Sequence, residues 1–325
     1  MRYVFVVLVL LAGCAEKLDS RIIEQVPIVE NQSAAAPAPE PDTGFEEWIE
    51  SRRTRARVID NDDDKEDEPD TEERADSFRM RFAYQLQHAN FNGLNALDVD
   101  LIVVDPDDAD FSESQLQELN ERKQVFAYLS VGEAETYRDY WQESWGEGNP
   151  SWLGPENTQW GSYRVKYWER GWQDIVFQRL DEMERQGYSG VFLDTVDTYR
   201  HWRENGVPDA EEKMAALVKE LAGRTSMQVY ANNALDLHED AEYLDAIDGN
   251  GIEGLWYVDG RSRDAHVTEG WERDLDRAKS AGKRVLVLEY VSGSDACDVL
   301  GKAEEKGYWA YVATRELDHI VHTSC

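Results

Sequence analysis

Residues 190–199 read Gly-Val-Phe-Leu-Asp-Thr-Val-Asp-Thr-Tyr, so a short apolar run meets one carboxylate and a second follows three positions later. The run from Gly190 to Leu193 fits a strand of a parallel sheet, because strands buried on both faces are near-continuous apolar runs rather than alternating ones. The stretch therefore predicts an α/β fold with Asp194 at the carboxyl end of a buried strand.

Seven further apolar runs repeat this pattern. They are FAYQLQ near Phe82, DLIVVD ending at Asp105, VFAYLSVGE ending at Glu133, QVYANN ending at Asn233, a weaker run over 252–256, RVLVLEY ending at Tyr290 and YWAYVATRE ending at Glu316. Between most of them lie stretches of helical character, namely SESQLQELNER, WQDIVFQRLDEMERQ, AEEKMAALVKELAG, GWERDLDRAKSAG and SDACDVLGKAEEKG. Gly187, Gly223, Gly282 and Gly307 stand where these helices are expected to end.

Eight strands separated by helices within about 250 residues, Ser77–Cys325, predict a (β/α)8 TIM barrel. A doubly wound open sheet is the alternative. The sequence contains neither G-x-G-x-x-G nor G-x-x-x-x-G-K-[ST], the motifs that would favour a nucleotide-binding form of that sheet.

The chain begins MRYVFVVLVLLAGC, which is similar to a bacterial lipoprotein signal that ends at a lipid-bearing cysteine. We expect residues 1–14 to be this signal and Cys14 to carry the lipid; an uncleaved membrane anchor is the alternative. Because Ala15 rather than Asp follows the cysteine, the pattern favours the outer membrane. Both interpretations place the rest of the chain outside the cytoplasm.

Residues 15–76 have the composition of a disordered acidic tether, with 20 acidic and 8 basic residues and few aromatic ones. They contribute −12 to the formal net charge of −33. So acidic a protein is a poor partner for nucleic acid, whose phosphates require clustered Lys and Arg. The net negative charge has two possible explanations, adaptation to a salty habitat and a role in substrate binding, and the sequence favours neither.

The remaining cysteines, Cys297 and Cys325, form an even pair in a chain that carries an export signal, and we expect them to form a disulfide. The sequence has no C-x-x-C pair, and its six histidines are scattered. We therefore predict no metal and no cofactor.

Polar residues follow nearly every predicted strand, at the end of the barrel where active sites lie. They are Gln85, Gln87, Asp105, Glu133, Asp194, Asn232, Asn233, Glu253 and Glu289. A carboxylate-rich mouth suits glycosidic bond cleavage, which commonly uses one protonated and one ionised carboxyl group. Binding of Mg²⁺ or Ca²⁺ is the rival use of such a set.

Residues 141–172 hold six of the eleven tryptophans, with Gly, Pro and Asn between them. We predict a long functional loop here, because tryptophan rings give sugars flat apolar platforms with polar rims. About half of these rings should instead pack the loop onto the barrel, Trp168 and Trp172 among them.

Five segments follow one another along the body: AYLSVGEAETYRDYW, VKYWERGWQDIV, GYSGVFLDTVDTY, the site at 251–253 and LVLEY. Together they resemble the glycoside hydrolase family 114 superfamily, whose characterised members are endo-α-1,4-polygalactosaminidases. The resemblance covers the whole body. The superfamily includes proteins labelled as cysteinyl-tRNA synthetase-like, but this sequence has no ATP motif of a synthetase. It implies a TIM barrel, an amino-sugar polysaccharide substrate and a catalytic pair formed by Asp194 as nucleophile or base and Glu253 as general acid.

Further substrate-binding candidates are Tyr128, Glu133, Asp197, Tyr199, Asn232, Glu289, Tyr290 and Trp160. Relatives often have Gln-Asn where this chain has Asn232-Asn233, so contacts there are expected to differ. The sequence thus predicts a monomeric, membrane-tethered endo-acting glycosidase. A non-catalytic polysaccharide-binding lipoprotein and a metal-dependent deacetylase are the alternatives.

Overall fold

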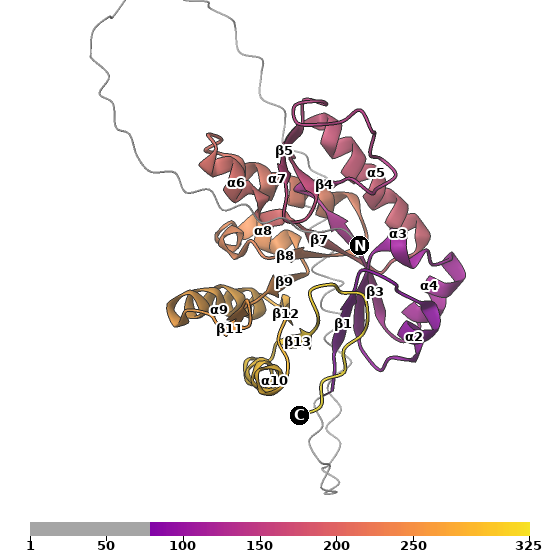
Figure 1. Ribbon diagram of the computed structural model, residues 1–325, viewed down its shortest axis with the longest axis vertical. Coiled ribbons are helices and arrows are strands. Elements are labelled where there is room, and N and C mark those ends of the chain that lie inside the picture. The colour runs from indigo at the N-terminus through magenta and orange to yellow at the C-terminus, as the bar shows by residue number, and fades with distance from the viewer. Residues whose placement is uncertain (1–78) are drawn as a thin grey trace, which may run out of the picture. The chain divides into compact units, whose positions relative to one another are not determined.

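The computed structural model describes residues 79–325, so the predicted signal peptide, Cys14 and the predicted tether lie outside the described residues. Eight parallel strands form one sheet in the order β1–β2–β3–β7–β8–β9–β12–β13 (Figure 1). Their bounds are β1 Phe82–Gln85, β2 Leu101–Val104, β3 Gln124–Ser130, β7 Gly190–Asp194, β8 Gln228–Asn232, β9 Gly249–Glu253, β12 Arg284–Glu289 and β13 Trp309–Val312. This is a (β/α)8 TIM barrel, as predicted.

Helices connect the strands on the outside of the sheet. Their bounds are α2 Phe91–Ala96, α3 Pro106–Ala109, α4 Glu113–Asn120, α5 Arg170–Gln186, α6 Tyr199–Glu204, α7 Ala210–Arg224, α8 Ala241–Ala246, α9 Ala265–Ser280 and α10 Ser294–Lys306, with the 3₁₀ turns η2 Val196–Thr198 and η3 Leu235–Glu239. The five predicted helical stretches correspond to α4, α5, α7, α9 and α10.

Two of the four predicted glycine caps are the left-handed residue that ends a helix, Gly187 at φ 100° after α5 and Gly307 at φ 64° after α10. Gly282 has φ 80° and follows the cap residue Ala281. The prediction for Gly223 is wrong, because α7 continues through it to Arg224. The buried apolar face of α7 outweighs the small helix-breaking tendency of a single glycine.

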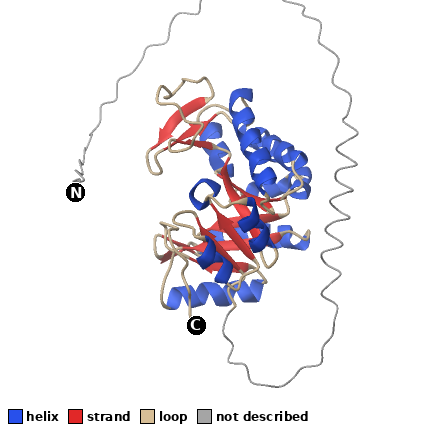
Figure 2. Ribbon diagram, turned by 90° about the vertical axis from the view of Figure 1, so that its right-hand side faces the viewer, coloured by secondary structure: helices blue, strands red, loops and turns tan. Residues whose placement is uncertain are grey.

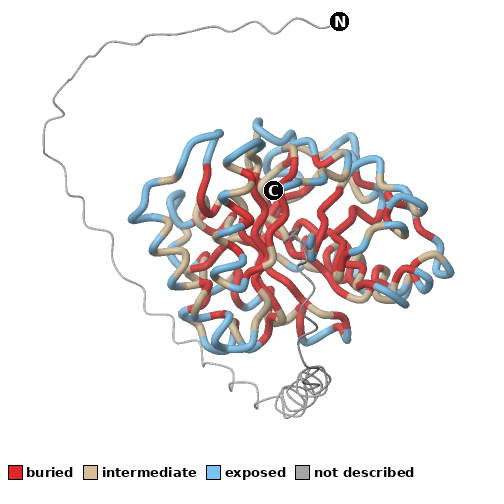
Figure 3. Tube along the Cα trace, turned by 90° about the horizontal axis from the view of Figure 1, so that it is seen from below, coloured by how far each residue is buried: buried red, intermediate tan, exposed pale blue. Residues whose placement is uncertain are grey.

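Aromatic rings and glycines fill the barrel interior together, and the buried strands at its centre are visible in Figure 3. A Cβ on Gly190 would lie 2.3 Å from the Phe126 ring, and one on Gly249 would lie 2.6 Å from the Tyr230 ring. These two rings meet edge to face at 4.7 Å. The sequence of β9, GNGIE, is only weakly strand-like because its glycines leave room for rings from neighbouring strands.

The barrel closes between its first and last strands through the segment after β13. Leu317 O accepts hydrogen bonds of 2.9 Å from Leu86 N and 3.1 Å from Gln87 N. At the opposite, amino end of the strands, Arg79 bonds Asp98 and Asp100, which precede β2. The described chain therefore enters the barrel at the amino ends of its strands.

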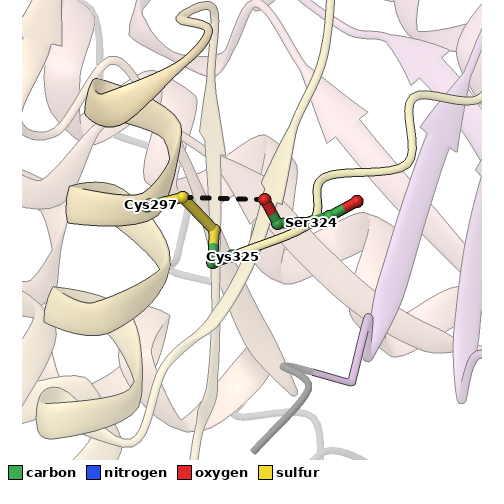
Figure 4. Close-up of a disulfide and its surroundings, with 3 residues drawn as sticks. All are labelled: Cys297, Ser324 and Cys325. Carbon is green, nitrogen blue, oxygen red and sulfur yellow. Dashed lines mark hydrogen bonds between the residues drawn. A yellow bond between two sulfur atoms is a disulfide. The ribbon is translucent and has the colours of Figure 1, made fainter.

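The C-terminal residue is joined covalently to the outer helical layer. A disulfide links Cys325 to Cys297 on α10, with their Cα atoms 5.6 Å apart (Figure 4). It closes a separation of 28 residues that includes all of β13. The tail after β13 is thereby tied to the last helix of the barrel.

A small antiparallel sheet is added beyond the barrel strands, beside α5 and α6 (Figures 1 and 2). It consists of β4 Glu133–Glu135, β6 Ser162–Val165 and β5 Leu153–Asn157, in that order. Two predictions need correction here. The third barrel strand ends at Ser130, so Glu133 belongs to the small sheet, and the tryptophan-rich segment contains two strands rather than one long loop.

A short hairpin, β10 Tyr257–Val258 and β11 Arg261–Ser262, follows β9. Within the described residues, none of the helices combines the length and the apolar character that crossing a bilayer requires.

Candidate active site

Asp194 is the last residue of β7, and its carboxylate is held by both neighbouring strands. Its Oδ2 accepts a hydrogen bond of 2.9 Å from the hydroxyl of Tyr128 on β3. Its Oδ1 accepts one of 2.9 Å from Nδ2 of Asn232 on β8. The parallel register that pairs Ser130 with Asp194 brings these donors to the same end of the barrel.

Glu253 is the last residue of β9 and is fixed in a similar way. Its Oε1 accepts a hydrogen bond of 2.7 Å from Nδ2 of Asn232, and its Oε2 accepts one of 2.6 Å from the hydroxyl of Tyr290. Its backbone N–H donates to Oδ1 of Asn233 at 3.1 Å. The structure thus brings Glu253, Asn232 and Tyr290 together, as the barrel prediction requires.

The amide of Asn232 connects the two carboxylates. Its bonds of 2.9 and 2.7 Å meet at one nitrogen, so Asp194 Oδ1 and Glu253 Oε1 are separated by at most the sum of these lengths, about 5.6 Å. An ionised carboxylate only accepts hydrogen bonds, which fixes the orientation of the amide. Asn232 Oδ1 points away from both groups and has no hydrogen-bond partner among the described residues.

Glu253 is a buried carboxyl group beside a second carboxylate. Burial raises the pKa of Glu253 above its usual value, and the neighbouring charge of Asp194 raises it further. The hydrogen bonds from Tyr290 and Asn232 favour the ionised form and act in the opposite direction. A carboxyl group that keeps its proton is suited to general acid catalysis, so Glu253 fits that role in the pair.

Asp197 is a third carboxylate close to this pair. It lies on η2, its side chain is 37% exposed, and burial and the charge of Asp194 raise its pKa to about 6. Arg200 approaches it at 3.8 Å, but the same guanidinium bonds Asp236 at 2.7 Å. Asp197 is therefore only loosely paired and remains accessible to a ligand.

Three predicted substrate-binding residues, Glu133, Tyr199 and Glu289, are buried in the structure. Glu133 is buried and accepts hydrogen bonds from Ser162 and Asn157 within the small sheet. Tyr199 and Glu289 are fully buried, with no exposed surface in this structure.

The environment of Glu289 explains its burial. Because side chains alternate along a strand, Tyr290 reaches Glu253 whereas Glu289 points to the other side. There its Oε1 accepts a hydrogen bond of 2.6 Å from the backbone N–H of Trp256. Glu289 therefore supports the loop that follows Glu253.

Five of the six tryptophans in residues 141–172 pack against other rings. Trp145 contacts Trp141 at 5.5 Å and Trp152 at 5.0 Å, and Trp152 in turn contacts Trp172 at 5.2 Å. Trp168 packs against Trp202. Trp168 and Trp172 are thus structural, as predicted, and the sixth ring, Trp160, is 63% exposed.

Two supporting residues were missed by the sequence analysis. Thr195 directly follows Asp194 and has φ 58°, a strained conformation for a β-branched residue. Its hydroxyl accepts the Gly132 N–H at 2.8 Å and bonds the Ser130 hydroxyl at 2.9 Å. Arg138 is the second, a buried guanidinium that bonds Asp105, Asp107 and Glu135. For the Thr195 contacts, the one local signal in the sequence is Gly132, the glycine of the Ser-Val-Gly segment.

Residues 65–325 match the model of glycoside-hydrolase family GH114. This chain belongs to that family. It is therefore a glycoside hydrolase, which is consistent with two carboxyl groups held at one barrel mouth. No group of three or more His, Cys, Asp or Glu side chains among the described residues is arranged to hold a metal ion.

Sequence relatives of this GH114 protein occur in at least two different organisms. The uncharacterized protein MJ1477 of Methanocaldococcus jannaschii is 32% identical over 274 residues, which cover 76% of this chain and 79% of the relative. An uncharacterized protein of Thermotoga maritima is 30% identical over 260 residues, covering 72% and 80%.

Two solved structures share the fold. The glycoside hydrolase domain of PelA from Pseudomonas aeruginosa has a TM-score of 0.60 at 19% identity and covers 75% of this chain and 97% of that domain. Ega3 from Aspergillus fumigatus, solved in complex with galactosamine, has a TM-score of 0.61 at 18% identity and covers 78% and 98%. Both likenesses support the barrel architecture.

Proposed function

We propose that this protein is an endo-acting glycosidase that cleaves an α-linked amino-sugar polysaccharide of the polygalactosamine type. The observation that carries the proposal is the placement of Asp194 and Glu253 on either side of one donor, Asn232. Galactosamine in the Ega3 structure indicates the sugar class that a barrel of this family accommodates.

In the mechanism we propose, Glu253 protonates the glycosidic oxygen while Asp194 attacks the anomeric carbon, and the bond between that carbon and the leaving oxygen breaks. A water molecule then attacks the same carbon, gives its proton to Glu253 and releases Asp194. Nearest carboxylate oxygens at most about 5.6 Å apart support this retaining course, because retaining enzymes hold their carboxyl groups about 5–5.5 Å apart. Proton NMR of the first product anomer tests the stereochemistry.

An amino sugar carries a positive ammonium group wherever it is not acetylated. Asp197 lies three residues after Asp194 and is only loosely paired with Arg200, which supports a role in binding that ammonium group. The acidic character of the chain is compatible with a cationic polymer.

A reducing-end assay on polygalactosamine tests the proposal with purified wild-type protein and the variants Asp194→Asn and Glu253→Gln. We expect both substitutions to abolish release of reducing ends while the melting temperature stays near that of the wild type. Wild-type activity in either variant would remove that residue from the catalytic pair.

We further propose that the enzyme is lipid-anchored at the cell envelope through Cys14 and acts outside the cytoplasm. The support is the signal-like sequence of residues 1–14. Cell fractionation of the Cys14→Ala variant tests the anchor. The wild type should appear in the membrane fraction and the variant should not.

A further inference from the structure

Two large aromatic side chains remain exposed at one edge of the small sheet. Among the described residues, the exposed large hydrophobic side chains are Tyr137 at 69%, Trp160 at 63%, Val258 at 41% and Val267 at 38%. Most of the rings near Trp160 in sequence are covered by other rings. The exposure of Tyr137 and Trp160 therefore has no explanation in the packing of the fold.

Tyr137 and Trp160 lie on adjacent turns. The first turn follows β4 and is closed by a hydrogen bond of 3.2 Å from Arg138 N to Glu135 O. The second turn joins β5 to β6 and is closed by a bond of 3.0 Å from Trp160 N to Asn157 O. The two turns lie next to each other where the β4–β6 pairing ends, and the hydroxyl of Thr136 donates to Gly161 O at 3.4 Å.

The turn that carries Tyr137 is connected to the catalytic centre through Arg138. The guanidinium carbon of Arg138 lies 5.9 Å from the centre of the Tyr128 ring and 4.7 Å from that of the Tyr137 ring. The two ring centres are therefore at most the sum of these distances apart, about 10.6 Å. Since the Tyr128 hydroxyl donates to Asp194, Tyr137 lies within reach of a polymer bound across the site.

The Tyr137 ring is also held in place despite its exposure. Its hydroxyl donates to Glu135 Oε1 at 2.6 Å, and the buried Arg138 that packs against it is fixed by Asp105 at 2.6 Å. A ring that is already ordered binds a ligand at a lower cost in conformational entropy. Such ordering is expected of a binding surface.

We propose that Tyr137 and Trp160 form a distal subsite that binds amino-sugar residues of the polysaccharide chain being cleaved at Asp194 and Glu253. This inference rests on the proposed function. Aromatic faces present apolar area with a polar rim to a pyranose ring. They also attract an ammonium group, which an amino sugar supplies and a neutral sugar does not. The subsite gives the enzyme a preference for long chains over short ones.

Kinetics on two substrates test the distal subsite. Wild type, Tyr137→Ala, Trp160→Ala and the double variant are compared, as full chains, on polygalactosamine and on a galactosamine trimer. We expect the ratio of kcat/KM for the polymer to that for the trimer to fall about threefold in each single variant and about tenfold in the double variant, through a raised KM for the polymer.

Two controls accompany these variants. Val267→Ala removes an exposed apolar side chain on α9, which is not part of the small sheet, and should leave the ratio unchanged. Trp160→Phe keeps an aromatic face and should retain most of the preference for the polymer. An unchanged ratio in the double variant, or equal losses on both substrates, would overturn the proposal.

A binding measurement separates this inference from the proposed function. Isothermal titration of polygalactosamine into Glu253→Gln, with and without the Tyr137→Ala and Trp160→Ala substitutions, needs no catalysis. Binding that weakens about tenfold in the triple variant supports the subsite even where the wild type cleaves nothing. Equal binding by the two proteins contradicts the subsite whatever the activity assay shows.

Discussion

The carboxylates of Asp194 and Glu253 accept hydrogen bonds from the same nitrogen, Nδ2 of Asn232. These groups come from the ends of three consecutive strands of the barrel, β7, β8 and β9. The amide therefore sets the distance between the two catalytic candidates as well as the orientation of each.

Replacing this shared donor should impair catalysis without unfolding the barrel. We expect Asn232→Ala to lower kcat about a hundredfold, the order of loss seen when one preorganised donor is removed from an active site. The measurement is kcat on polygalactosamine together with the melting temperature. A fully active variant would show that the bridging amide does not position the pair.

The hydroxyl of Tyr290 favours the ionised form of Glu253, so its removal should raise the pKa of that carboxyl group further. If Glu253 is the acid, activity is lost as pH rises through its pKa. We therefore expect the alkaline limb of the pH–rate profile to move to higher pH in Tyr290→Phe.

Tyr243→Phe is the matched control for this experiment. Tyr243 is a fully buried tyrosine on α8, and its hydroxyl has no hydrogen-bond partner among the described residues. The pH–rate profile of the Tyr243→Phe variant should coincide with that of the wild type. If instead the acidic limb of the Tyr290→Phe profile moves to higher pH and the alkaline limb stays in place, Glu253 acts as the base and the assignment is reversed.

Glu289 should make the stability of the protein depend on pH. Burial raises its pKa from 4.5 to about 7 in the folded state. The contribution of Glu289 to the free energy of unfolding is complete below about pH 4.5, where it is protonated in both the folded and the unfolded state. This contribution is lost as pH rises through about 7. The loss amounts to at most about 3 kcal/mol.

Glu289→Gln cannot titrate, so this part of the pH dependence should disappear. Urea denaturation between pH 4.5 and 7 measures the free energy of unfolding of the wild type and of Glu289→Gln. Subtracting the two values at each pH removes the contributions of other titrating groups such as Asp197. If the free energy of unfolding changed with pH in the same way for both proteins, the raised pKa of Glu289 would be contradicted.

The disulfide should contribute to stability by restricting the unfolded chain. For a separation of 28 residues, loop-closure entropy predicts that Cys297→Ser lowers the free energy of unfolding by about 4 kcal/mol. Cys325→Ser removes the same bond and should give the same loss, as should reduction of the wild type. A loss confined to one serine variant would indicate a local effect of that side chain.

The strands and the catalytic candidates were predictable from sequence because their signals are local. Apolar runs mark the strands, and the position directly after a run marks Asp194. The bridge made by Asn232 was not predictable, because it depends on the register between three strands. The direction of Glu289 was missed for a related reason: a shift of one residue moves a strand side chain to the other face.

The strands of the small sheet could not be predicted because their composition is not typical of strands. Strand β5 reads LGPEN, which contains Gly and Pro, and its partner β6 has only four residues. Trp141 packs on Tyr163 of β6 and Trp145 packs on Trp152 directly before β5, and these contacts compensate for the weak strand propensity. Tertiary contacts of this kind leave no pattern in the local sequence.

The position of Arg79 has a consequence for how the enzyme would meet its substrate. Arg79 lies at the amino ends of the barrel strands, whereas Asp194 and Glu253 lie at the carboxyl ends. A protein anchored to a membrane through the residues before Arg79 is attached at the end of the barrel opposite the catalytic mouth. With the proposed lipid on Cys14, the residues that lead to the anchor would leave the barrel on the side away from Asp194 and Glu253, so the attachment would not obstruct the approach of a long polymer.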